Sequence, residues 1–135
     1  MTSATSALLV VAGGAVGAPT RYLVDRWVSA LVDRLESSQE VVRPVGLFPW
    51  GTLVVNLVGS FLLGVISVQA SPRLATLLGA GFCGALTTYS TFGAQTLYLI
   101  EEGEARVAAW NVGVSVVAGV AAAALGVAVG GAVAG

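Results

Sequence analysis

The sequence contains no histidine and no lysine, and all six of its basic residues are arginine. The chain therefore lacks the side chain that serves most often as a general base and as a metal ligand. A single cysteine, Cys83, excludes an intrachain disulfide and any metal site built from several cysteines. The formal net charge of −1 gives no indication of nucleic-acid binding. We therefore expect neither a catalytic residue nor a nucleic-acid partner, and do not expect an enzyme.

Charged residues are also scarce, at 10% of the 135 positions, whereas a soluble domain carries about 25%. They gather in two clusters, Arg21–Arg43 and Glu101–Arg106, with Arg73 alone between them. The rest of the chain consists of four uncharged stretches, residues 1–20, 44–72, 74–100 and 107–135. Each is long enough to cross about 30 Å of hydrocarbon. A soluble four-helix bundle would need a polar face on every helix, and these stretches have none.

The sequence therefore predicts an all-α integral membrane protein of the cell membrane, surrounded by lipid. We expect a single domain over residues 1–135, with transmembrane helices at about 7–27, 46–69, 73–100 and 106–132. Each predicted helix has a stripe of small or hydroxyl-bearing side chains, and none has a carboxylate at membrane depth. Amides and hydroxyls can solvate an ion but cannot relay charge by titrating near neutral pH.

The third uncharged stretch contains an unusual cluster of hydroxyl groups. Thr87, Thr88, Ser90 and Thr91 surround Tyr89, and glycines precede and follow the cluster. Serine and threonine can bond to the backbone in place of the helical ladder, and glycine weakens that ladder further. This pattern predicts a helix broken at membrane depth. The alternative is a continuous helix whose hydroxyls bond to carbonyls one turn earlier.

Polar residues also lie inside the second and fourth helices. Asn56 and Ser60 share one stripe of the second helix, and Asn111 and Ser115 share one stripe of the fourth. Polar groups at membrane depth face the bundle interior or an aqueous path. The alternative for Asn56 is a hydrogen bond that holds two helices together. Arg21, near the end of the first helix, either attracts anions at a vestibule or extends to the membrane surface.

Three segments closely resemble the Fluc (CrcB) family of fluoride channels. They are Gly14–Tyr22 (GAVGAPTRY), Gly51–Phe61 (GTLVVNLVGSF) and Gly81–Phe92 (GFCGALTTYSTF). The match covers three of the four predicted helices in the same order. The resemblance implies a dual-topology, antiparallel dimer of four-helix subunits whose third helix is broken. Two pores through that dimer would export cytoplasmic fluoride, and a structural sodium ion would lie at its centre.

The resemblance also implies roles for individual residues. The fluoride pore would be lined by Asn56 and the aromatic pair Tyr89 and Phe92, with a polar track of Ser90, Thr91 and Ser115. Backbone carbonyls of Gly84 and Thr87 would hold the sodium ion, and Arg21 would stand in the vestibule. The chemistry suits fluoride, because an asparagine amide offers two N–H donors, a hydroxyl offers one, and an aromatic ring presents a positive edge. One departure is Tyr89, where the family usually has phenylalanine.

Two alternatives remain. A small multidrug-resistance-type exporter also has four helices, but it needs a glutamate in the first helix, where no carboxylate precedes Asp25. The other is a non-conducting or obligatory partner subunit of a heterodimeric fluoride channel. With four spans, Arg73 is the only arginine on the side that carries both termini, against five on the other side. That bias favours a fixed orientation over dual topology. Stripes of small residues on every helix nevertheless favour an antiparallel dimer, and we expect a homodimer with the heterodimer as the alternative.

Overall fold

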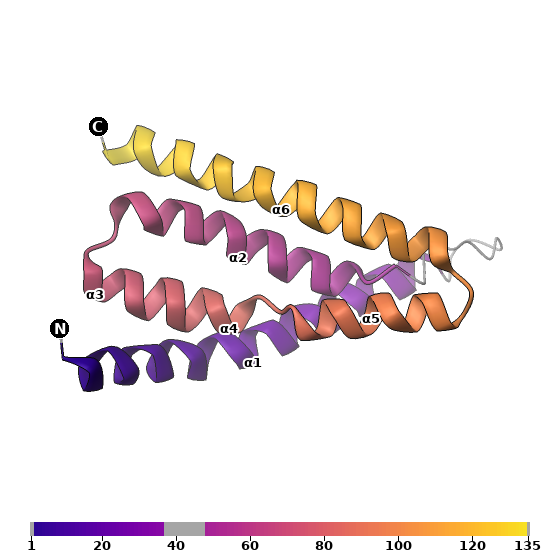
Figure 1. Cartoon of the computed structure of the whole chain (residues 1–135), viewed down its shortest axis with the longest axis horizontal. Helices are drawn as coiled ribbons and strands as arrows, with labels where there is room; N and C mark the ends of the chain where they lie inside the picture. Colours follow the sequence, from indigo (N-terminus) through magenta and orange to yellow (C-terminus); the bar gives the residue numbers. More distant parts are fainter. Residues whose placement is uncertain (1, 37–47, 135) are drawn as a thin grey trace.

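The structure, a computed structural model, describes residues 2–36 and 48–134, and Figure 1 shows its arrangement. The described residues form helices and no strand, which confirms the predicted all-α class. In chain order the elements are α1 (Ser3–Glu36), α2 (Trp50–Gln69), α3 (Pro72–Leu74), the π-helical segment η2 (Ala75–Cys83), α4 (Gly84–Leu86), α5 (Ser90–Glu101) and α6 (Ala105–Ala134).

Three of these helices are long and apolar enough to cross a membrane. They cover residues 3–35, 50–69 and 105–133 of the described chain. The third uncharged stretch does not form one continuous helix, because it is divided between α4 and α5 at Thr87–Tyr89. The length and composition of the three long helices make the chain an integral, multi-pass membrane protein.

The first helix is longer than the charge pattern indicates. It continues to Glu36, past the expected end at Trp27, and Pro19 lies inside it without ending it. Charged residues do not stop a helix where it leaves the hydrocarbon, so the first charge cluster marks the membrane boundary rather than the helix end. The second helix begins at Trp50 and follows Pro49. Residues 46 and 47, its expected start, and Arg43 lie outside the described residues.

The helices pack as two close pairs. Figure 1 shows α2 beside α6, with both running toward the end that carries the C-terminus, and α1 beside the α3–η2–α4 run. The backbones of each pair touch at glycines. A Cβ atom added to Gly126 would overlap the carbonyl oxygen of Phe61, and one added to Gly13 would overlap that of Leu77. Small residues thus allow the close backbone approach that membrane helices use for packing.

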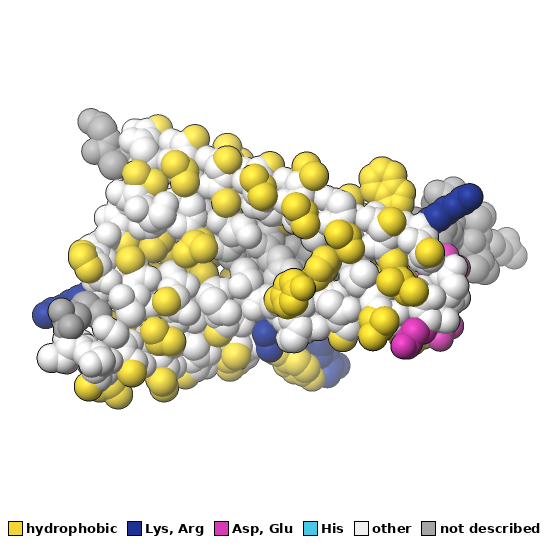
Figure 2. Space-filling model, in the orientation of Figure 1, with side chains coloured by type: hydrophobic (Ala, Val, Ile, Leu, Met, Phe, Trp, Pro, Cys, Tyr) yellow, Lys and Arg dark blue, Asp and Glu magenta, His cyan; other side chains and the backbone are white. Residues whose placement is uncertain are grey.

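The outer surface of the molecule is apolar. Figure 2 shows hydrophobic side chains over most of one face and acidic side chains at one end only. Large apolar side chains on α6 are exposed, among them Val116, Val117, Val120 and Leu125. Such a surface suits hydrocarbon rather than water. The two termini lie at the same end of the molecule as the turn between α2 and α3 (Figure 1).

Candidate functional site

The break between α4 and α5 is built by the threonines of the hydroxyl cluster. Thr87 has an extended backbone, with φ −75° and ψ 157°, which ends α4. Its hydroxyl donates to the carbonyl oxygen of Cys83 at 3.0 Å. Thr88 then accepts the backbone N–H of Thr91 with its hydroxyl oxygen at 3.2 Å, which caps the start of α5. The helix is therefore broken as predicted, and the alternative of a continuous helix is wrong, although the Thr87 hydroxyl does bond to a carbonyl one turn earlier.

Asn56 on α2 bridges to this break. Its Nδ2 donates to the carbonyl oxygen of Thr88 at 3.1 Å, and its Oδ1 accepts the backbone N–H of Thr88 at 2.7 Å. This pair of bonds sets the amide orientation, because a flipped amide would place donor against donor and acceptor against acceptor. The bridge uses one of the two N–H groups that the sequence assigned to the anion. One N–H of Asn56 remains for a ligand.

The bridge lies on the wall of a groove of about 690 Å³, which is lined by residues of α2, η2, α4, α5, α6 and the break. Six of the residues predicted for ion binding line this groove: Asn56, Gly84, Thr87, Tyr89, Phe92 and Ser115. They come from three separate parts of the chain, α2, the run from α4 to the start of α5, and α6. Gly59 allows the approach of α2, because a Cβ atom there would overlap the methyl group of Thr87.

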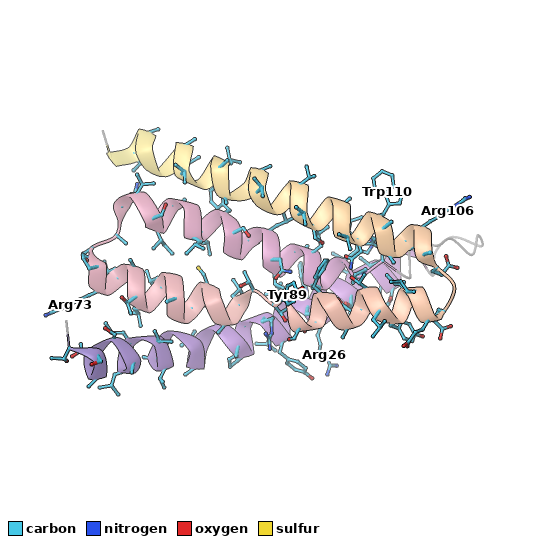
Figure 3. The ribbon with its side chains drawn as sticks, in the orientation of Figure 1. Arg26, Arg73, Tyr89, Arg106 and Trp110 are labelled. Carbon is cyan, nitrogen blue, oxygen red and sulfur yellow. The ribbon has the colours of Figure 1, made fainter. Side chains whose placement is uncertain are left out.

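The aromatic pair, Tyr89 and Phe92, lines the same groove. The ring centroids of Tyr89 and Phe92 are 6.1 Å apart, and the ring planes are tilted by 45°. Tyr89 is 86% exposed in the single chain, and Figure 3 shows it at the break, midway along the molecule. An aromatic side chain so exposed at membrane depth offers its ring edge and hydroxyl to whatever covers the groove.

Three predicted residues do not line the groove. Ser90 and Thr91 instead surround the hydroxyl of Thr88, whose oxygen lies 3.4 Å from the Ser90 hydroxyl and donates to the Thr91 hydroxyl at 3.0 Å. Arg21 is half-buried on α1 and is not among the groove residues. The structure of one chain thus brings the polar track to the edge of the groove, but leaves the proposed vestibule residue apart from it.

The structure also assigns positions to polar residues that the sequence analysis left without a role. Thr88 is 8% exposed and is the residue that Asn56 holds. Asn111 is 1% exposed, and its Nδ2 donates to the hydroxyl of Thr96 at 2.8 Å. That hydroxyl donates in turn to the carbonyl oxygen of Phe92 at 2.7 Å, so α6 holds α5 in place. The sequence could have indicated this role for Asn111, because it is a polar amide inside an uncharged stretch.

Metal binding through side chains has no support in the described residues, which contain no group of three or more histidine, cysteine, aspartate or glutamate side chains. Backbone carbonyl oxygens could still act as ligands for a cation. Gly84, the first residue of α4, and Thr87, which follows its last residue, are the two residues predicted to hold a cation, and both line the groove. Carbonyl oxygens freed by a broken helix are suitable ligands for a small hard cation.

Comparisons with known proteins agree on one family. The profile of the family described as "CrcB-like protein, Camphor Resistance (CrcB)" matches residues 8–127. "Fluoride-specific ion channel FluC 1" of Streptomyces avermitilis is 46% identical over 125 residues, covering 89% of this chain and 91% of that protein. A Frankia casuarinae protein of the same name is 45% identical, covering 90% and 92%. "Fluoride-specific ion channel FluC" of Shewanella sp. (strain W3-18-1) is 43% identical, covering 80% and 82%.

Proposed function

The chain belongs to the CrcB-like family, and from this membership we propose that it is a fluoride-selective channel through which cytoplasmic fluoride leaves passively. The relatives named above are each called fluoride-specific ion channels. The observation that carries the proposal on this chain is the groove in which Asn56, Tyr89, Phe92 and Ser115 meet. These side chains come from α2, from α6, and from the break with the adjoining start of α5, and they offer anions N–H, O–H and ring-edge contacts.

The proposed mechanism is replacement of water around a small, tightly hydrated anion. The remaining N–H of Asn56 and the hydroxyl of Ser115 are donors, and both residues line the groove, one from α2 and one from α6. The ring edges of Tyr89 and Phe92 carry partial positive charge and complete the shell. The amide of Asn56 and the hydroxyl of Ser115 cannot relay charge by titrating near neutral pH, so the ion moves down its own gradient.

The proposed channel is an antiparallel, dual-topology dimer of four-span subunits with two pores. The broken run from α3 to α5 supplies the fourth span. Support comes from the groove itself, which is open along one side of the single chain and leaves Tyr89 86% exposed. A second copy over this face would bury the ring and close the pore walls. Stripes of small residues on the helices favour such close association.

The proposed central sodium ion fits the residues of the break. The carbonyl oxygens of Gly84 and Thr87 would hold it, and oxygen ligands of this kind suit a small hard cation. When bound, the ion would supply a positive charge that offsets the cost of bringing anions into a low-dielectric region. The chain contributes the backbone carbonyls and the hydrogen bonds that shape the break.

A second candidate is an obligatory subunit of a heterodimeric fluoride channel. It is favoured by the arginine distribution, because Arg73 lies at the end that carries both termini, whereas Arg26 and Arg106 lie farther along the bundle (Figures 1 and 3). A strong arginine bias orients a membrane protein one way, whereas a homodimer of opposite orientations needs little bias. In this case the chain alone would not conduct.

Flux from liposomes that contain only this chain tests both candidates. We expect the purified protein to discharge a fluoride gradient when a potassium ionophore balances charge, and to leave a chloride gradient nearly intact. A fluoride electrode and a chloride electrode measure the two rates. Equal rates for both halides would contradict the selectivity. Absence of fluoride flux from a folded protein would favour the heterodimer.

The aromatic pair gives a graded test of the same pore. We expect Phe92→Ile to slow fluoride flux strongly, because isoleucine has no ring edge for the anion. Tyr89→Phe should leave flux unchanged or increase it, because it keeps the ring and removes only the hydroxyl. Both variants are compared with wild type by initial rates in the liposome assay. Loss of flux in Tyr89→Phe would instead make the phenol hydroxyl a necessary donor.

A further inference from the structure

Two backbone N–H groups at the break bond to side chains instead of to the backbone. In a continuous α-helix, each N–H bonds to the carbonyl oxygen four residues earlier. Thr88 would then donate to the oxygen of Gly84, and Thr91 to the oxygen of Thr87. Those two carbonyls belong to the two residues that the proposed function assigns to the cation. The structure redirects both donors.

The first donor is taken by the amide of Asn56. The N–H of Thr88 bonds to Oδ1 of Asn56 at 2.7 Å rather than to Gly84. The N–H of Thr87, the next nearest backbone donor, bonds to the carbonyl oxygen of Cys83 at 2.9 Å. The oxygen of Gly84 therefore lacks the donors that a helix would direct at it.

The second donor is taken by the hydroxyl of Thr88. The N–H of Thr91 bonds to the Thr88 hydroxyl oxygen at 3.2 Å rather than to the carbonyl of Thr87. That hydroxyl is well placed for the task, because it donates its own proton to the hydroxyl of Thr91 at 3.0 Å and keeps a lone pair for the N–H. Thr88 is 8% exposed, so water does not compete freely for these bonds.

We propose that Asn56 and Thr88 create the cation site by accepting these two N–H groups and so freeing the carbonyl oxygens of Gly84 and Thr87. Both are positioning residues for the cation, and they act through the backbone rather than by contact with the ion. The proposal rests on the proposed function for the presence of the cation. It adds that Asn56 serves two ions, holding the break open with its oxygen while its remaining N–H faces the groove.

Substitution of Thr88 tests the proposal without measuring transport. The readout is thermal unfolding in detergent, followed by tryptophan fluorescence, as sodium replaces N-methyl-D-glucamine at constant ionic strength. A cation that binds only the folded protein raises the unfolding temperature as its concentration increases. A fit of that rise gives the sodium concentration at which half of the folded protein has bound the ion, which we call the half-maximal sodium concentration. Thr88→Val keeps the shape of the side chain but removes the acceptor, so the N–H of Thr91 returns to the Thr87 oxygen. We expect the half-maximal sodium concentration to rise about tenfold or more, comparable to one hydrogen bond to a charged group.

Two matched variants control for general damage. Thr88→Ser retains the hydroxyl oxygen and should keep the half-maximal sodium concentration close to that of wild type. Ser90→Ala removes a neighbouring hydroxyl that accepts no redirected N–H, and it should also leave that concentration unchanged. An unchanged sodium dependence in Thr88→Val would overturn the proposal, as would a wild-type protein that sodium does not stabilise.

Asn56→Leu keeps the test decisive where Thr88→Val does not fold. Leucine offers no acceptor to the N–H of Thr88, so that N–H returns to the Gly84 oxygen and the half-maximal sodium concentration should rise; an unchanged value contradicts the proposal. Fluoride flux separates this inference from the proposed function. Fluoride flux without sodium stabilisation rejects the inference alone, and sodium stabilisation without fluoride flux rejects the proposed function alone.

Discussion

Asn56→Asp is expected to lower fluoride flux by about a hundredfold or more while the protein still folds. The substitution keeps the size of the side chain but replaces the amide nitrogen and both of its N–H donors with an oxygen of a negatively charged carboxylate. Two like charges about 4 Å apart repel by roughly 4 kcal/mol at the effective dielectric constant of a partly buried site. The carboxylate also faces the carbonyl oxygen of Thr88, which Nδ2 now contacts at 3.1 Å. Initial rates from fluoride-loaded liposomes measure the loss.

Gln69→Glu is the matched control for this prediction. Gln69 is also an amide on α2, and its Nε2 donates to the carbonyl oxygen of Gly130 at 3.0 Å. It lies at the end of the helix, away from the groove, so a charge there should leave fluoride flux near the wild-type rate. Flux within a few-fold of wild type for Asn56→Asp would show that Asn56 only holds α2 to the break.

Gly126→Ala is expected to destabilise the protein strongly, although it adds a single methyl group. The added Cβ would overlap the carbonyl oxygen of Phe61 on α2, and a backbone oxygen cannot rotate away. The helices must separate, and overpacking of this kind costs about 1–3 kcal/mol. For a chain of this length we expect the unfolding temperature to fall by roughly 5 °C or more. Thermal unfolding in detergent measures it.

Gly131→Ala tests whether this effect comes from the helix contact. Gly131 lies on the same helix, and a Cβ atom there would meet nothing within 4 Å. Alanine has the higher helix propensity, so this variant should be as stable as wild type or more stable. Equal loss of stability in both variants would contradict the close packing of α6 against α2.

The position of the break was predictable because its causes are local. Thr87 and Thr88 bond to groups three or four residues away in the chain, and hydroxyl groups at that spacing are visible in the sequence. The same is true of the membrane-spanning helices, whose apolar length is a property of consecutive residues. The end of α1 was not predictable in this way, because the charges after Arg21 mark the limit of the hydrocarbon and not the limit of the helix.

The sequence by itself thus determined that the chain is helical, crosses a membrane and carries the motifs of its family, and it predicted a break at the hydroxyl cluster over the alternative of a continuous helix. Only the tertiary structure decided what Asn56 does, because its partner Thr88 is 32 residues away and lies on another element. The same holds for the groove, whose wall combines Ser115 of α6 with the aromatic pair. Local hydrogen bonds depend on neighbours in the chain, whereas convergence depends on which helix faces touch, and glycines such as Gly126 set those contacts through packing.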